Sequence, residues 1–330
     1  GRMGITHFSI LNSHPDVKIA AICDSSSTML GIVKKYIGVA TYTDYNKMID
    51  ELDLDFIVIS TPTDSHSRII DDALSHQLHI FSEKPFALNP KDGSRILEKL
   101  KTSNMVNQVG YVNRFNEVFV AVKEQLDAGL IGEIKHYKSE MYGATVLKDS
   151  KSSWRGKKKA GGGCMYEFAS HCIDLAVYLF GKPDRVKGSI LQSVYSSEVE
   201  DIVGTQFIYD KGFNGNIMVN WSDESYRKPT NVVKIFGTKG SIIADKHAYK
   251  VYLREPSKAA GFDKGWNTRY ITDFAKSVRF YVRGNEFTRQ LDYFIDQIRD
   301  NSADNISSFA DAYITDELID AIQRDALNSS

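Results

Sequence analysis

The sequence predicts an N-terminal α/β domain with a doubly wound parallel sheet, followed by an α+β domain with a large, open, mostly antiparallel sheet. Two observations indicate this division. Up to about residue 115, short apolar runs alternate with helical patterns, which is typical of parallel strands joined by helical crossovers. Beyond about residue 130, strand-like segments follow one another with few helices between them. The 330 residues fit about two domains, which we expect to span residues 1–115 and 116–330.

The N-terminal elements follow from apolar runs, caps and helix breakers. Strands are expected at 17–23, 55–60, 77–82 and 105–111, and helices at 25–37, 66–75 and 90–101. The first of these helices has N-cap candidates at Ser25–Ser27, and Asn89-Pro90 supplies a cap and a first-turn proline to the last one. The alternation implies right-handed crossovers and a parallel sheet that is covered on both faces.

The C-terminal part is a series of predicted strands closed by two helices. Strands are expected at 134–142, 185–195, 201–209, 213–221, 231–237, 241–245 and 249–253, and helices at 287–300 and 308–325. Lys211-Gly212 and Thr238–Gly240 are hairpin signals, so most of these strands are antiparallel. Residues 148–163 are rich in Lys, Ser and Gly, and we expect a mobile loop there.

Composition excludes several classes of protein. The chain has 41 Lys and Arg against 42 Asp and Glu, so it lacks the basic surplus typical of a nucleic-acid partner. Its apolar runs, such as residues 56–59, are far shorter than the ~20 residues that a membrane helix needs. Cys23, Cys164 and Cys172 form no disulfide framework, which favours a cytoplasmic protein. We expect no nucleic-acid or membrane partner.

The first residues indicate a dinucleotide site. Gly1-Arg2-Met3-Gly4 precedes a helical pattern and matches the second half of a G-x-G-x-x-G turn. Asp24 ends the next strand, 20 residues after Gly4, where a carboxylate would bind ribose hydroxyls and repel a 2′-phosphate. No basic residue follows before Lys34, so NAD is favoured over NADP. The alternative is a plain loop with Asp24 as a helix cap. The turn's first glycine and the preceding strand are missing, and we expect a truncated form of a longer protein.

Glu83-Lys84-Pro85 follows the third predicted strand, at the carboxyl edge where doubly wound sheets bind ligands. A lysine beside a nicotinamide ring can hold a substrate hydroxyl and lower its pKa. The alternative interpretation is a surface turn that ends in proline.

The segment Gly161–Asp174 begins with three glycines, which permit close approach of the backbone to a ligand. In the helix predicted after them, Glu167, His171 and Asp174 share one face. An acid four residues before a histidine can orient the imidazole, although a structural or solvated pair is the alternative. Cys164, His171 and Cys172 do not match a zinc pattern, so we expect no metal and interpret both cysteines as core residues.

Taken together, these short motifs carry a family resemblance. They are Gly1–Gly4, Ala21–Asp24, Thr61-Pro62 with His66, Glu83–Pro85, Gly110–Arg114, Trp154-Arg155, Gly161–Asp174 and Gly237–Ser241. In this order and spacing the chain resembles the glucose–fructose oxidoreductase / inositol dehydrogenase (Gfo/Idh/MocA) family over nearly its whole length. The resemblance implies an N-terminal Rossmann domain, a C-terminal domain on an open antiparallel sheet, and NAD(P)-dependent redox chemistry at a carbinol or keto carbon. The implied substrate is a sugar, a polyol or a nucleotide-linked sugar.

The resemblance also implies residue roles. Lys84 is the expected catalytic lysine and His171 the acid/base that touches the substrate hydroxyl. Glu167 stands where the family usually has Asp, and it either orients His171 or binds substrate. The expected cofactor-binding residues are Gly1, Arg2, Met3, Asp24, Thr61, Pro62, His66, Glu83, Lys84, Asn113, Trp154 and Arg155. The expected substrate-binding residues are Lys84, Arg114, Glu167, His171 and Asp174. Without the resemblance, Thr61-Pro62 is a strand-ending turn, His66 a helix cap and Trp154 a loop anchor.

Two other function classes remain at this stage. One is an NAD-dependent glycosidase with redox-neutral turnover, and the other is a non-catalytic dinucleotide-binding regulator, which would need neither Lys84 nor His171. Lys157–Lys159 either form a solvated stretch or contact an anionic group, such as the diphosphate of a nucleotide sugar. We expect the open face of the C-terminal sheet to form a homodimer or homotetramer.

Overall fold

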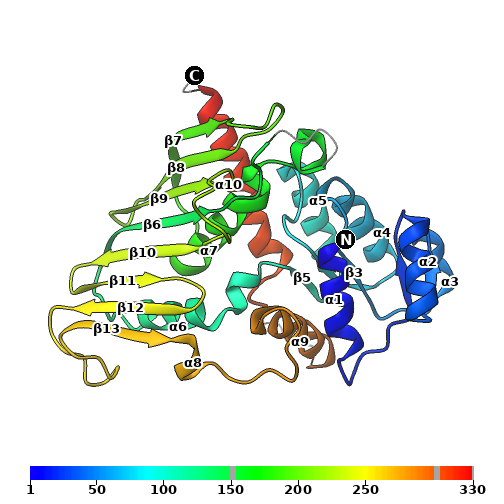
Figure 1. The fold of residues 1–330 in the computed structure, drawn as a ribbon, viewed down its shortest axis with the longest axis horizontal. Coiled ribbons are helices and arrows are strands. Elements are labelled where there is room, and N and C mark those ends of the chain that lie inside the picture. Colours follow the sequence, from blue (N-terminus) through cyan, green and yellow to red (C-terminus); the bar gives the residue numbers. More distant parts are fainter. Residues whose placement is uncertain (149–153, 301–304, 329–330) are drawn as a thin grey trace.

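The computed structural model describes residues 1–148, 154–300 and 305–328. An eight-stranded sheet fills one side of the molecule and the N-terminal strands and helices the other, with α9 (Asn285–Asp300) beside α1 (Arg2–Asn12) (Figure 1). Of the predicted loop 148–163, residues 149–153 lie outside the described residues. The remainder contains two short 3₁₀ turns, η3 (Trp154–Gly156) and η4 (Lys158–Ala160).

The N-terminal strands are all parallel, as predicted, but they form two sheets. One contains β1 (Ala21–Cys23) and β2 (Ala40–Tyr42); the other has the order β3 (Phe56–Ile59), β4 (His79–Ser82) and β5 (Asn107–Val109). In the second sheet Phe56 pairs with His79, and Ile80 pairs with Asn107. Strand β2 was not predicted, because three residues carry too little alternation to be recognised.

The predicted helix starts are confirmed by their caps. The Ser26 hydroxyl accepts a hydrogen bond from Met29 N at the start of α2, and the Asn89 side chain accepts one from Asp92 N at the start of α5. The N-terminal helices besides α1 are α2 (Ser27–Tyr36), α3 (Tyr45–Glu51), α4 (His66–Ser75) and α5 (Pro90–Leu100). The later helices besides α9 are α6 (Glu117–Asp127), α7 (Ser170–Phe180), α8 (Ile271–Phe274) and α10 (Phe309–Asn328).

The C-terminal sheet has the order β13-β12-β11-β10-β6-β9-β8-β7. The strands are β6 (Ile134–Tyr142), β7 (Arg185–Gln192), β8 (Ile202–Tyr209), β9 (Phe213–Asn220), β10 (Val232–Gly237), β11 (Gly240–Ala244), β12 (Ala248–Leu253) and β13 (Gly265–Tyr270). Every neighbouring pair is antiparallel except β6 and β9, which confirms a mostly antiparallel sheet. The two predicted hairpins join β8 to β9 and β10 to β11.

Three apolar clusters hold these layers together. The largest lies between the eight-stranded sheet and the helices α6, α7 and α10, and it includes Trp221 and Cys172. In a second cluster Phe309 of α10 packs against Phe86, and in a third Phe294 of α9 packs against Phe81 of β4. The two closing helices, α9 and α10, therefore pack against the N-terminal part of the chain. The division into two domains at residue 115 stays a prediction.

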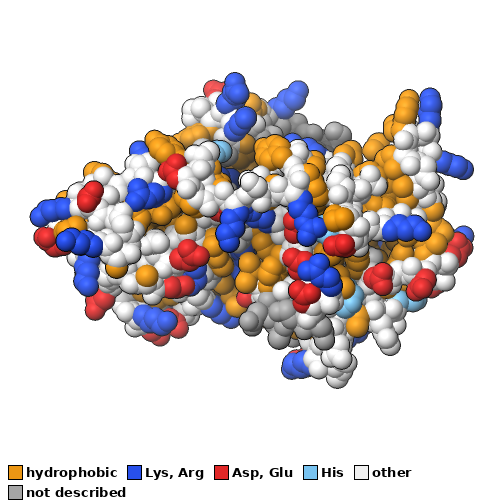
Figure 2. Space-filling view, turned by 90° about the horizontal axis from the view of Figure 1, so that it is seen from below, with side chains coloured by type: hydrophobic (Ala, Val, Ile, Leu, Met, Phe, Trp, Pro, Cys, Tyr) orange, Lys and Arg blue, Asp and Glu red, His pale blue; other side chains and the backbone are white. Residues whose placement is uncertain are grey.

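Acidic and basic side chains are interspersed over the face shown in Figure 2, in keeping with a net charge of −1. Among the described residues, no helix combines the length and the apolar character needed to cross a bilayer.

Candidate functional site

The opening glycines and Asp24 lie together at one end of the N-terminal strands. Gly1 N is 4.0 Å from Asp24 Oδ2, and Asp24 Oδ1 accepts a hydrogen bond of 2.8 Å from Ser26 N. A Cβ on Gly4 would lie 3.0 Å from Ser60 Oγ, so glycine lets α1 approach the end of β3. The first N–H groups of α1 and the Asp24 carboxylate thus lie close to each other, an arrangement that fits the diphosphate and the ribose of a dinucleotide. Ser26 caps α2, so the alternative of Asp24 as the cap does not hold.

His66 joins the turns that follow β3 and β4. Its Nδ1 lies 3.0 Å from Pro85 O and its Nε2 lies 3.0 Å from Thr61 O, and the side chain is fully buried. Burial lowers the pKa of His66, so the ring is neutral and donates to only one of the two carbonyls at a time. The ring therefore supports the Thr61-Pro62 turn, and the cofactor-binding role expected for it stays a prediction. Thr61 and Pro62 themselves are exposed.

Glu83 is anchored to α1. His7 Nε2 lies 2.6 Å from Glu83 Oε1, and Glu83 Oε2 accepts a hydrogen bond from Lys84 N at 3.3 Å. Burial alone would raise the pKa of Glu83, but the hydrogen bond to His7 and the charges of His7 and Lys84 outweigh it and hold the pKa below its usual value. An ionised Glu83 thus fixes the backbone of Lys84 relative to the start of α1.

Lys84 reaches the segment that follows the glycines. Its Nζ donates to the carbonyl oxygens of Tyr166 and Glu167 at 3.2 and 3.3 Å and lies 3.7 Å from Glu167 Oε1. Glu167 Oε2 also accepts a hydrogen bond of 3.1 Å from Arg155 Nε. Burial would raise the pKa of Glu167, but the two cations outweigh it and lower that pKa. The Lys84 side chain is therefore held against the segment that follows the three glycines.

A π-helical turn over Met165–Ala169 separates Glu167 from His171. The sequence predicts an α-helix here, with both side chains on one face. Because a π turn is wound more widely than an α turn, the spacing no longer brings the two together. The Glu167 carboxylate instead contacts Lys84 and Arg155, and the described residues contain no hydrogen bond between Glu167 and His171.

His171, in the first turn of α7, is partly buried and lies edge-on to the Tyr111 ring, with 6.4 Å between the ring centroids. Its Nδ1 is buried and has no hydrogen-bond partner within the described part of the chain. Burial, followed by the positive charges of Lys84 and Lys246, places the pKa of His171 well below its ordinary value. The imidazole is therefore neutral at pH 7 and able to accept a proton.

The glycine run packs tightly against its surroundings. Gly161 has a φ of +77°, and a Cβ there would lie 3.0 Å from Thr63 Cβ in the turn after β3. Gly163 N donates to Arg155 O at 3.0 Å, and Met165 N donates to Glu200 Oε1 at 2.8 Å. The glycine run thus meets the turn after β3 and Glu200, both of which are distant in sequence. Next to them, Trp154 lies 5.1 Å from the Arg155 guanidinium, while Lys157–Lys159 are exposed and line an open groove with Glu198.

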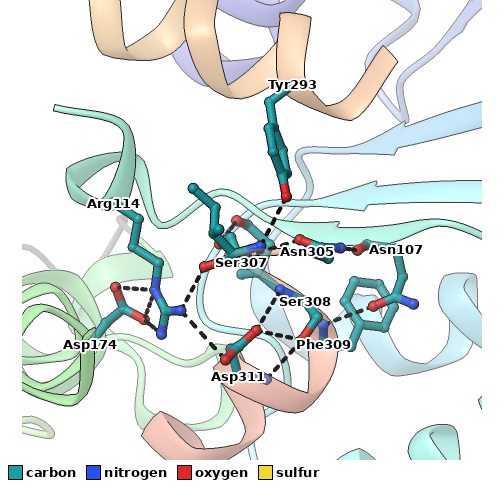
Figure 3. Close-up of polar contacts among 11 residues, drawn as sticks. Asn107, Arg114, Asp174, Tyr293, Asn305, Ser307, Ser308, Phe309 and Asp311 are labelled. Carbon is teal, nitrogen blue, oxygen red and sulfur yellow. Dashed lines mark hydrogen bonds and ion pairs between the residues drawn. The ribbon is translucent and has the colours of Figure 1, made fainter. Parts of the chain in front are cut away.

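Arg114 and Asp174 form a buried ion pair, with side chains 3% and 1% exposed (Figure 3). Arg114 Nε lies 3.0 and 3.1 Å from the two Asp174 oxygens, and Nη2 lies 2.8 Å from Oδ1. Arg114 Nη1 also donates to Ile306 O at 2.7 Å and lies 3.6 Å from Asp311 Oδ1. The pair ties α7 to the segment before α10, and the substrate-binding role expected for both residues stays a prediction. The neighbouring Asn113 is buried, and its Oδ1 has no partner among the residues described.

Two family models match the chain. The model described as "Oxidoreductase family, NAD-binding Rossmann fold" matches residues 1–111, and the "GFO/IDH/MocA C-terminal domain" model matches residues 119–243. The chain belongs to the Gfo/Idh/MocA family of oxidoreductases. Its N-terminal part is accordingly an NAD-binding Rossmann fold, as the resemblance implied.

Other Gfo/Idh/MocA proteins are similar over most of their length. Myo-inositol 2-dehydrogenase of Thermotoga maritima is 24% identical over 314 residues, which cover 94% of this chain and 84% of that protein. The scyllo-inositol 2-dehydrogenase (NAD(+)) of Bacillus subtilis is 25% identical over 306 residues, covering 91% and 84%. A levoglucosan dehydrogenase, solved in complex with NADH and levoglucosan, shares the fold with a TM-score of 0.86 and 22% identity, covering 99% of this chain and 96% of that chain.

Three residues at this Gfo/Idh/MocA site were not predicted: His7, Lys246 and Arg283. His7 is 76 positions from its partner Glu83. Lys246 lies in the turn between β11 and β12, and Arg283 lies just before α9. Each is an isolated residue without a local motif, so only the folded chain reveals its neighbours.

Proposed function

We propose that this chain is a dehydrogenase or reductase that transfers a hydride between NAD and a carbinol or keto carbon of a sugar or polyol. The observation that carries the proposal is the combination of Lys84, held against the backbone of Tyr166 and Glu167, with a neutral His171 four residues further along the same segment, whose pKa the charge of Lys84 helps to lower. The inositol dehydrogenases and the levoglucosan dehydrogenase to which the chain is similar support the substrate class.

In the oxidative direction, His171 accepts the proton of the substrate hydroxyl. Lys84 donates to the same oxygen and stabilises the developing alkoxide by ~3 kcal/mol, a value typical of one preorganised donor. Glu167 holds the Lys84 side chain in place through its carboxylate and its carbonyl. NAD supplies the hydride acceptor when it is bound. In the reductive direction His171 returns the proton.

We further propose that NAD is preferred over NADP. The Asp24 carboxylate ends β1 beside the start of α1, where a 2′-phosphate would meet its negative charge. The ribose hydroxyls of NAD would instead donate hydrogen bonds to it.

The test is formation of NADH by the purified chain with NAD⁺ and a panel of inositols, anhydro sugars and free sugars. His171→Ala should lower turnover by about 10²–10⁴ while the affinity for NADH, measured by fluorescence, changes little. The matched control is His76→Ala, since His76 is exposed on the far end of α4. A glycosidase would cleave a glycoside without net NADH, and a regulator would bind NADH without turnover. Either result, or full activity in His171→Ala, would reject the proposal.

We also propose that a second copy of the chain covers the outer face of the C-terminal sheet. Large apolar side chains lie exposed on consecutive strands of this face: Met218, Phe236, Ile243, Tyr252 and Trp266. Exposed apolar rows of this kind usually mark contacts between proteins. Light scattering should report a dimer or tetramer, and Phe236→Asp with Trp266→Asp should convert it to monomer. A monomeric wild-type chain would contradict this.

A further inference from the structure

His7 is a buried histidine in the second turn of α1, and the proposed reaction has not yet used it. Its Nε2 donates to Glu83 Oε1 at 2.6 Å, and the Glu83 side chain is buried as well. The start of the same helix lies beside Asp24, where a dinucleotide fits. The contact therefore joins the proposed cofactor helix to the residue that precedes Lys84.

The ring of His7 is held in one orientation. It lies edge-on to the Phe81 ring of β4, with 5.1 Å between the centroids, and Phe81 in turn packs against Phe294 of α9 at 5.8 Å. His7 Nδ1 is buried and has no hydrogen-bond partner in the described part of the chain. Packing on one side and the carboxylate on the other therefore fix the ring, and Nε2 is the nitrogen that acts.

Glu83 is held just as closely by the ends of the parallel strands. Its N–H donates to Ile59 O at 2.8 Å, and Gly110 N donates to Ser82 O at 2.8 Å. A Cβ on Gly110 would lie 3.1 Å from Glu83 Oε1, so the absence of a side chain there leaves room for the carboxylate next to His7. The backbone of β3, β4 and β5 thus presents this carboxylate to α1.

Lys84 depends on this carboxylate for the position of its backbone. Glu83 Oε2 accepts a hydrogen bond of 3.3 Å from Lys84 N, and Lys84 Nζ donates to Tyr166 O at 3.2 Å. If His7 is removed, the ionised carboxylate keeps only the weaker of its two hydrogen bonds among the described residues. A buried charge with so little compensation is costly, so the carboxylate should turn toward the cations that act on it, Lys84 and Arg283.

We propose that His7 is a positioning residue, which acts through Glu83 to hold Lys84 where its ammonium meets the substrate oxygen. This inference rests on the function proposed above and adds a residue to its reaction. From His7 to Glu83, Lys84 and Tyr166, each contact in the series is 3.3 Å or shorter. Helix α1 would therefore carry both the diphosphate of the cofactor and the support for Lys84.

The experiment compares two substitutions of His7. His7→Phe keeps a flat ring against Phe81 but removes the donor, whereas His7→Gln returns an N–H donor at about the distance of Nε2 from the backbone. The control is His14→Phe, since His14 is also buried and its Nε2 lies 3.5 Å from Asp292 Oδ1, away from Lys84. Sites are counted by NADH fluorescence, so that kcat refers to folded protein only.

His7→Phe should lower kcat per NADH site by about 10–100-fold, the loss expected for one hydrogen bond to a charged group. KM and the Kd for NADH should stay within about threefold, because the interaction serves the transition state. His7→Gln should recover most of kcat, and His14→Phe should keep it. Glu83→Gln tests the same contact from the other side, and its combination with His7→Phe should cause no further loss.

Labelling of Lys84 by trinitrobenzenesulfonate, followed by mass spectrometry of its peptide, gives a readout that needs no turnover. The Lys84 side chain is 12% exposed, so its rate of modification reports its position. The rate should change in His7→Phe and should match that of the wild type in His7→Gln and in His14→Phe.

Several results would overturn the inference while leaving the proposed function standing. They are full kcat in His7→Phe, a loss that His7→Gln does not recover, an equal loss in His14→Phe, and an unchanged rate of Lys84 labelling in His7→Phe. A loss confined to NADH affinity would make His7 a part of the cofactor site only and would also reject it. Absence of NADH formation by the wild type with every substrate counts against the proposed function, and the labelling of Lys84 then still decides whether His7 positions that lysine.

Discussion

Replacing Arg114 by Met should destabilise the protein far more than breaking an ion pair at the surface. The guanidinium makes three contacts of 2.8–3.1 Å with Asp174 and one of 2.7 Å with Ile306 O. Both partners of the pair are almost fully buried, so the substitution leaves the Asp174 carboxylate without compensation. Removing one member of such a pair costs about 3–5 kcal/mol.

This free energy can be converted into a melting temperature. At an average unfolding entropy of about 2.1 cal/mol/K per residue, 330 residues give a decrease of about 4–7 °C. The assay is thermal unfolding followed by circular dichroism, with urea unfolding as a second measure. Lys182→Met is the control, because the Lys182–Glu317 pair is exposed and should contribute only about 0–1 kcal/mol.

A double substitution tests whether the loss of stability comes from the unpaired charge of Asp174. Arg114→Met with Asp174→Leu removes both charges and should recover much of the lost stability, since apolar replacements of buried pairs are often close to neutral. A loss in Arg114→Met no larger than in Lys182→Met would refute the reasoning. If instead stability is unchanged and KM rises about tenfold, the pair binds substrate as the sequence first suggested.

Three further predictions follow from the same contacts. Lys246→Met removes a positive charge that lowers the pKa of His171, so the acid limb of the kcat/KM profile should move to higher pH. A shift to lower pH would contradict the proposed role of His171 as the base. The other groups that act on the His171 ring are the charge of Lys84 and the ring of Tyr111. Asp24→Ala should improve KM for NADP by about tenfold while NAD affinity falls; an unchanged ratio would remove Asp24 from the ribose site. His66→Ala removes the ring that donates to one of the carbonyls of Thr61 and Pro85, and it should lower the unfolding free energy by about 1–3 kcal/mol, whereas a neutral effect would show that water replaces the ring.

Local sequence signals were sufficient for most regular elements. The start of α5 and the hairpins of the C-terminal sheet were predicted correctly, because caps, prolines and glycines act within a few residues. No element was predicted for residues 40–42, 45–51, 117–127 or 265–270, which form β2, α3, α6 and β13. Of these, β2 and α3 are short and β13 has a polar sequence, so the formation of these three depends on pairing and packing with distant parts of the chain.

The sequence by itself determined the family, the two kinds of sheet and the expectation that Lys84 and His171 act together, because each rests on short motifs in a fixed order. Only the tertiary structure decided which partners these residues have. The π turn directs Glu167 to Lys84, folding joins His7 to Glu83 and Arg114 to Asp174, and the β11–β12 turn brings Lys246 to His171. The members of each of these pairs are 60 or more residues apart in the sequence. Their energies depend on burial and charge, which are properties of the folded chain.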